Sequence, residues 1–130
     1  MIKKIVFIAL AFFLFTLPVP ARELNIRTSP GIATVEEYKD LLKYDLKENW
    51  TVPEKNTHRR ASVAVFINRD GTLKSYKFIQ SSKSKKIDAS IGQSIKKTFP
   101  YEDLPPEHPK KILEVRIIFD YNVYLGTSVY

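Results

Sequence analysis

The segment Ala61–Ser82 constrains the fold more than any other part of the sequence. In its first half, ASVAVFIN, successive residues belong alternately to two sides of an expected strand. An Asp-Gly dipeptide follows at Asp70-Gly71. Alternation next to Asp-Gly predicts a β-hairpin, because glycine accepts the positive φ that tight hairpin turns require. The apolar residues of the second half do not share one parity, so we expect a bulge near Lys74-Ser75. An isolated hairpin is marginally stable in water, so other elements must pack against it.

Two amphipathic helices are predicted to flank this hairpin. The first begins at Thr34, which has a glutamate three residues later and therefore the spacing of a capping box. Its apolar residues recur every four positions: Tyr38, Leu42, Leu46 and Trp50. The second is predicted over 85–99, capped by Ser82 or Ser84, and its apolar residues are Ile87, Ile91, Ile95 and Phe99. Gly92 is unfavourable inside this helix and indicates a close approach to the sheet.

The clearest alternation lies near the end of the chain, in Ile112–Tyr121. Its odd-numbered residues are apolar and are expected to face the helices, whereas most even-numbered residues are charged and should meet water. Two helices on one face of three strands make a two-layer α+β domain. The second helix makes a crossover, so the last strand runs parallel to the second hairpin strand. Placing it beside the first hairpin strand makes the whole sheet antiparallel. The predicted sheet is antiparallel, three-stranded and ordered 2-1-3, with the last strand at an open edge.

The first 21 residues have the layout of a secretory signal. Lys3 and Lys4 precede an apolar run over 5–17, and a small residue, Ala21, ends the segment. A helix needs about 20 apolar residues to span a bilayer, and this run is shorter. We therefore expect cleavage after Ala21 and a location outside the cytoplasm, with an uncleaved leader that tethers the protein as the alternative. Residues 22–33 are expected to be a flexible lead-in, 34–124 the domain and 125–130 a tail.

Few residues are suited to catalysis or to metal binding. Cysteine is absent, and the two histidines, His58 and His108, lie far apart without clustered carboxylates, so we expect neither a metal site nor a cofactor. Glycine-rich phosphate loops and G-x-S-x-G motifs are also absent, so we expect no enzyme and no small-molecule substrate. The net charge of +7 is too diffuse to indicate nucleic acid. The open edge of the sheet is the remaining candidate site. It could pair with another chain, or its charged residues could prevent such pairing, or the tail could cover it.

Several short motifs occur in a fixed order along the chain. They are Trp50 with Pro53 soon after, A-x-V-x-V-x-I-x-x-DG over Ala61–Gly71, Ser81-Ser82, Ile87-Asp88, Pro100-Tyr101, Leu104-Pro105 and the final alternating strand. This order and spacing resemble the C-terminal domain of the TonB family, whose relatives include the TolA C-terminal domain. The likeness covers roughly residues 38–121.

This resemblance implies a periplasmic adaptor without catalytic residues. In TonB proteins the domain takes a segment of an outer-membrane transporter as an extra strand beside its last strand. Carried over, that role falls on the backbone of the last strand here, and the expected partner is an extended segment of an envelope or outer-membrane protein. The expected binding residues are Ile112, Glu114, Arg116, Ile118 and Asp120.

Features of the N-terminal region depart from TonB proteins. The apolar run over 5–17 lacks the histidine of their membrane anchors, and about a dozen residues stand where those proteins have a long spacer rich in proline and lysine. We therefore expect a stand-alone periplasmic adaptor. The alternatives are a membrane-anchored, TonB-type energy transducer for outer-membrane transport and a structural envelope protein that homodimerises through its sheet edges.

Overall fold

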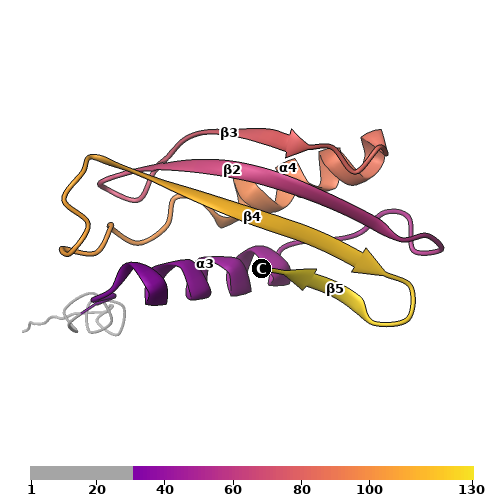
Figure 1. Ribbon diagram of the computed structural model, residues 1–130, viewed down its shortest axis with the longest axis horizontal. Helices are drawn as coiled ribbons and strands as arrows, with labels where there is room; N and C mark the ends of the chain where they lie inside the picture. Colours follow the sequence, from indigo (N-terminus) through magenta and orange to yellow (C-terminus); the bar gives the residue numbers. More distant parts are fainter. Residues whose placement is uncertain (1–30) are drawn as a thin grey trace, which may run out of the picture. The chain divides into compact units, whose positions relative to one another are not determined.

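The computed structural model describes residues 31–130, so the expected signal segment 1–21, its cleavage site and most of the lead-in lie outside the described residues. Residues Ile32–Tyr130 form one compact unit. Its elements, in chain order, are α3 (Val35–Glu48), β2 (Arg59–Asn68), β3 (Leu73–Gln80), α4 (Lys85–Thr98), β4 (Ile112–Asn122) and β5 (Gly126–Val129) (Figure 1).

Helix α3 begins where the capping pattern predicts. The Thr34 hydroxyl oxygen accepts a hydrogen bond of 3.0 Å from the Glu37 backbone N–H. The Glu37 carboxylate, in turn, accepts from the backbone N–H of Ala33, at 3.3 Å, and not from that of Thr34. The reciprocal half of the capping box is therefore displaced by one residue, to an N–H just before the helix, while the Thr34 side chain still satisfies one of the unpaired N–H groups of the first turn.

Helix α4 is capped by Ser84, whose hydroxyl oxygen accepts from the Ile87 N–H at 3.2 Å. The expected approach to the sheet at Gly92 is confirmed, because a Cβ atom there would lie 2.7 Å from the Tyr76 hydroxyl oxygen on β3. Any larger residue at position 92 would require the Tyr76 side chain to shift. Phe99, expected to be the last member of the apolar stripe, follows the helix and is only half-buried.

The sheet has four antiparallel strands in the order β3-β2-β4-β5. The predicted 2-1-3 arrangement is present within it, but the prediction of three strands is wrong, because residues 126–129 of the expected tail form β5. The chain turns back where the Asn122 side chain accepts hydrogen bonds from the backbone N–H groups of Tyr124 and Leu125, at 2.8 and 3.2 Å. Gly126, with φ +86°, completes the turn.

The hairpin of β2 and β3 contains two irregularities in register. Phe66 pairs with Ser75 and Ile67 with Leu73, so Lys74 is the extra residue of a bulge, as the sequence predicts. A second shift was not anticipated: between the pairs at Ser62 and Val63 it leaves Ile79 as the extra residue. Ile79 is 48% exposed as a result.

The loop 99–111 is tied to the hairpin turn and thereby positions the start of β4. Gly71 has φ +86° and its carbonyl oxygen accepts from the Tyr101 N–H at 2.8 Å. The Arg69 guanidinium donates to the carbonyl oxygens of Pro105, at 3.2 Å, and of His108. These bonds give partners to backbone groups of the loop that would otherwise lack a hydrogen bond within the protein.

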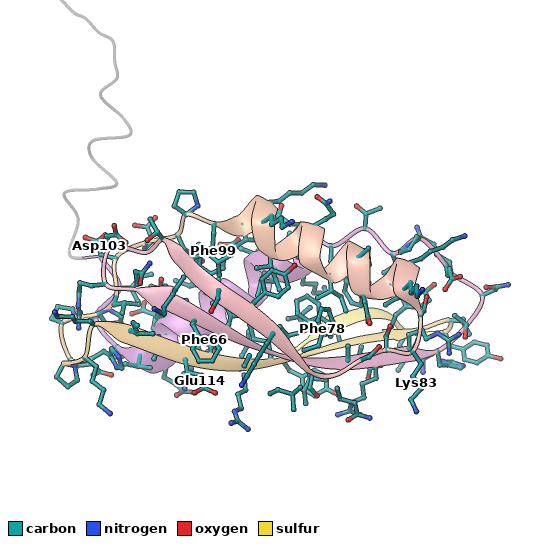
Figure 2. The ribbon with its side chains drawn as sticks, turned by 90° about the horizontal axis from the view of Figure 1, so that it is seen from above. Phe66, Phe78, Lys83, Phe99, Asp103 and Glu114 are labelled. Atoms are coloured by element: carbon teal, nitrogen blue, oxygen red, sulfur yellow. The ribbon has the colours of Figure 1, made fainter. Side chains whose placement is uncertain are left out.

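The core lies between the two helices and one face of the sheet. Trp50 packs edge-to-face on Phe119 of β4, with 5.3 Å between ring centroids, and its indole N–H donates to the Ser90 hydroxyl at 2.9 Å. The odd-numbered residues of β4 are buried on this face, as predicted. The opposite face, which carries Phe66 and its cross-strand neighbour Glu114, has no helix over it (Figure 2).

Candidate functional site

The edge of β4 is covered along only part of its length. Ile118 and Tyr130 exchange two backbone hydrogen bonds, of 2.7 and 3.0 Å, and the β5 pairing continues from Phe119 to Asn122. The expectation of a wholly open last strand is therefore wrong for its C-terminal part. Expected contact residues Ile118 and Asp120 lie in this covered part, and Asp120 also accepts a hydrogen bond of 3.4 Å from the Tyr130 hydroxyl.

The N-terminal part of the strand, residues 112–117, remains open and is called the open edge below. Backbone groups in an antiparallel strand alternate in direction, so the bonds at Ile118 show that the even-numbered residues point toward the line of β5. Within residues 31–130, no strand pairs with this side of β4 before Ile118. The carbonyl oxygen of Ile112 lies 2.9 Å from the His108 Nε2 atom. Glu114 and Arg116 therefore present the accessible backbone groups.

The side chains of Glu114 and Arg116 lie on the sheet face without helices and form an ion pair. The Arg116 Nε atom is 3.1 Å from a Glu114 carboxylate oxygen, and the two side chains are 74% and 43% exposed. An exposed pair of this kind contributes about 0–1 kcal/mol, so a binding partner can replace it at little cost. The structure thus brings together two of the five expected residues.

The opposite edge of the sheet, β3, is less suited to pairing. It carries the two bulges at Lys74 and Ile79, and both Lys74 and Lys77 are exposed on it. Bulges interrupt the ladder of backbone groups, and edge lysines discourage pairing with another chain. The open edge of β4 is therefore the better candidate for an interaction through the backbone.

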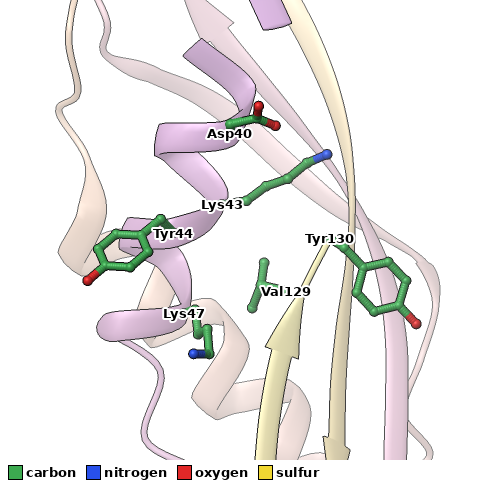
Figure 3. Close-up of a pocket in the computed structure, with 6 residues that line it drawn as sticks. All are labelled: Asp40, Lys43, Tyr44, Lys47, Val129 and Tyr130. Carbon is green, nitrogen blue, oxygen red and sulfur yellow. The ribbon is translucent and has the colours of Figure 1, made fainter. Parts of the chain in front are cut away.

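Two hollows meet at the end of β5, on either side of the line that an added strand would follow. One, of about 300 Å³, lies between α3 and β5 and is shown in Figure 3. In that view Asp40 and Lys43 extend from α3 into the space beyond the end of β5. The residues that line it are Asp40, Lys43, Tyr44, Lys47, Val129 and Tyr130.

The second hollow, of about 340 Å³, lies on the face without helices. It is lined by Ser62, Ile79, Arg116, Ile117, Ile118 and Tyr130. The reasoning from sequence missed Lys43 and Tyr130, whose roles depend on how α3 and β5 pack. A signal for Tyr130 was present in the Asn122 and Gly126 pair, because a short loop that ends in glycine after a strand is typical of a hairpin.

The described part of the chain contains no group of three or more histidine or acidic side chains arranged to hold a metal ion. None of the helices in residues 31–130 is long and apolar enough to cross a bilayer.

The chain matches the model of a known protein family. The family model described as TonB C terminal matches residues 35–119, which run from the start of α3 almost to the end of β4. No curated protein and no solved structure matches the chain. Domains of that family serve protein interaction in the cell envelope and have no enzymatic role. The match confirms the resemblance found in the sequence and covers more than half of the chain, which is therefore a member of the TonB C-terminal family.

Proposed function

We propose that this protein is a non-enzymatic adaptor of the periplasm that binds an extended segment of another envelope protein as an added strand. The observation that carries the proposal is the point at which β5 stops. Tyr130 pairs with Ile118, and the accessible backbone groups of Arg116 and Glu114 come next along the same edge. A segment that continues the line of β5 would pair with them by β-augmentation, in which the main chain supplies much of the affinity.

The charges beside the open edge support an antiparallel orientation for the added segment. With increasing distance from Tyr130, the face without helices presents Arg116 and then Glu114. On the α3 side, Lys43 is followed by Asp40 (Figure 3). On both sides of the line that an added strand would follow, the charge therefore changes from positive to negative with increasing distance from Tyr130. An antiparallel segment with an acidic residue opposite Arg116 and a basic residue two positions later, opposite Glu114, complements the face without helices, while the residue between them faces α3.

Site-directed photo-crosslinking in the host organism tests this proposal. A photoreactive phenylalanine at position 116 should crosslink to an extended segment of one envelope protein, whereas the same residue at Lys77 on β3 should not. Glu114→Pro, introduced beside the crosslinker, removes an N–H of the open edge, and an edge strand tolerates proline where its N–H faces away from its neighbour. We expect it to lower the yield at least about tenfold, whereas the matched Glu114→Gln, which keeps the N–H, should preserve it.

Equal crosslinking from position 77, or a full yield with Glu114→Pro, would contradict strand addition at the open edge. A crosslink to a second copy of the chain would support the homodimeric alternative. The mass of the processed protein separates the remaining two possibilities. A chain that begins at Arg22 supports the free adaptor, and a chain that begins at Met1 in the membrane fraction supports an anchored transducer.

A further inference from the structure

The turn between β4 and β5 exposes two large apolar side chains. Tyr124 is 87% exposed and Leu125 is 83% exposed, more than any other large apolar residue of the described chain. The Asn122 side chain holds the backbone of both residues, so the turn has a defined conformation. One exposed leucine needs no explanation, but two adjacent apolar residues at the tip of a hairpin point to a binding partner.

Two other segments meet this turn at the same end of the domain. The His58 ring lies 5.9 Å from the Tyr124 ring, and the Tyr121 hydroxyl donates to the Lys55 carbonyl oxygen at 3.0 Å. The start of α4 is joined to the same segment, because the Ser84 hydroxyl donates to the Glu54 carboxylate at 2.9 Å. Figure 1 shows the start of β2, the β4–β5 turn and the β3–α4 connection at one end of the domain.

Exposed lysines gather at this end, and the nearby carboxylates are engaged within the protein. Glu54 accepts from Ser84, and Asp88 accepts from Ser81 and Ser82 at 2.6 Å each. We call this end of the domain the basic tip. Its exposed residues are Lys55, Lys83, Lys85, Lys86, Tyr124 and Leu125.

The opposite end carries exposed charges of both signs. Asp70 is in the β2–β3 turn, and Asp103, Lys110 and Lys111 are in the loop 99–111, which the Leu104 N–H joins to the Arg69 carbonyl oxygen at 3.0 Å. Figure 2 shows Lys83 and Asp103 at the two extremes of the domain. At the basic tip, by contrast, the exposed lysines outnumber the nearby carboxylates, and such an excess of positive charge attracts a negative surface.

We propose that the basic tip docks on an anionic phospholipid surface. The Tyr124 ring would lie at the level of the headgroups, where tyrosine is favoured, and Leu125 would enter the edge of the acyl region. The lysines would contact headgroup phosphates. Two apolar side chains or a few lysines alone give weak attachment, but together they supply the two signals that stable peripheral binding requires. The tip lies beyond the C-terminal end of β4 and the open edge lies at its N-terminal part, so both surfaces can be occupied together.

Fluorescence quenching in the full-length chain tests this inference. Tyr124→Trp places a reporter at the tip, and Tyr44→Trp, at an exposed tyrosine on α3, is the matched control; Trp50 is 94% buried in both and gives a constant background. The probes are vesicles of brominated phosphatidylglycerol and of brominated phosphatidylcholine. We expect quenching of the reporter at 124 by the anionic vesicles, little quenching by the zwitterionic vesicles, and little at 44 with either.

Two further variants assign the effect to the tip. Joint replacement of Lys83, Lys85 and Lys86 by Gln should weaken partition into the anionic vesicles about tenfold or more, since each lysine contributes to attraction at the surface. The same replacement at Lys74, Lys96 and Lys97, which are also exposed, should not. An unquenched reporter at 124, equal quenching at 44, equal quenching by both lipids, or equal effects of the two triple variants would each overturn the proposal. The quenching reports how deeply residue 124 itself enters the bilayer. Attachment of the protein to the vesicles through its leader would therefore not produce the expected difference between positions 124 and 44.

Discussion

At the scale of single residues, two glycines share a backbone φ of +86° and differ in their surroundings. A Cβ on Gly71 would lie 2.2 Å from the Tyr101 carbonyl oxygen and 2.6 Å from that of Glu102, whereas a Cβ on Gly126 would meet nothing within 4 Å. We expect Gly126→Ala to cost about 1–2 kcal/mol, from backbone strain alone. Gly71→Ala should cost clearly more, because backbone atoms of the loop 99–111 must also move.

Urea unfolding measures the loss in the free energy of unfolding for both variants, provided that the m-values do not change. Equal losses in the two variants would contradict the close packing of the hairpin turn against the loop.

Asp88 is one residue through which pH should act on stability. Burial opposes its charged form, but hydrogen bonds from Ser81 and from the side chain and backbone of Ser82 outweigh that effect and hold its pKa below the ordinary value of 3.8. A lowered pKa stabilises the fold above pH 3.8, and this stabilisation is lost as the pH falls through the folded-state pKa. Asp88→Asn should therefore cost about 1–3 kcal/mol at pH 7 and much less near pH 2.5. A difference that is constant between these two pH values would contradict this assignment.

At the scale of secondary-structure elements, one buried hydroxyl joins the two helices. Ser94 on α4 is fully buried and donates to the Leu46 carbonyl oxygen, at 2.6 Å, in the last turn of α3. Carbonyl groups at the end of a helix have no partner within it, so Ser94→Ala should leave this oxygen unsatisfied and cost about 1–3 kcal/mol. The matched control is Gln93→Ala, on the exposed face of α4, which should be close to neutral. Chemical unfolding measures both, and a neutral Ser94→Ala would show that the bond contributes little.

The order of charges along the open edge predicts a preference between two peptides of equal composition. TVEVKVT places its acidic residue nearer Tyr130 in the antiparallel orientation, and TVKVEVT reverses the order. We expect the first to bind about three- to tenfold more tightly, as judged from cross-strand charge pairs. Fluorescence anisotropy measures both affinities. Joint replacement of Glu114 by Arg and Arg116 by Glu keeps the net charge and should reduce or invert the preference.

The outcomes of that experiment separate two conclusions. Equal affinities would contradict the role of the charges but would preserve strand addition, provided that Glu114→Pro abolishes binding. If neither peptide binds, strand addition itself is contradicted.

Elements with several repeats of a period, and turns with a strong local signal such as Asp70-Gly71, could be predicted from sequence, whereas a very short strand could not. The stripe from Tyr38 to Trp50 and the alternation over 112–121 each repeat often enough to fix an element and its buried face. Strand β5 has four residues, too few for a period, and its existence depends on the side chain of Asn122. The sequence therefore identified the strand that carries the open edge, but the predicted open edge was longer than the one in the structure.

At the scale of the whole molecule, residues 32–130 form the compact unit, and the last residues belong to it. Val129 packs against the core and Tyr130 hydrogen-bonds to Ile118. A fragment of residues 32–130 should therefore unfold in one cooperative transition, with a free energy of unfolding of about 5–15 kcal/mol. A fragment that ends at residue 124 should melt at least about 5 °C lower. Calorimetry compares the two, and equal melting temperatures would mean that the last six residues contribute nothing to the fold.

The division of the β4 edge between β5 and open backbone also bears on fibre growth. Fibrils grow when segments of about six or seven residues stack edge to edge without limit. Here β5 stops the ladder at Ile118, and the contact of His108 with the Ile112 carbonyl oxygen limits it at the other side. The stretch between them has room for one short foreign strand. The other edge, β3, is interrupted by the bulges at Lys74 and Ile79, so neither edge of the sheet offers a long uninterrupted ladder for stacking.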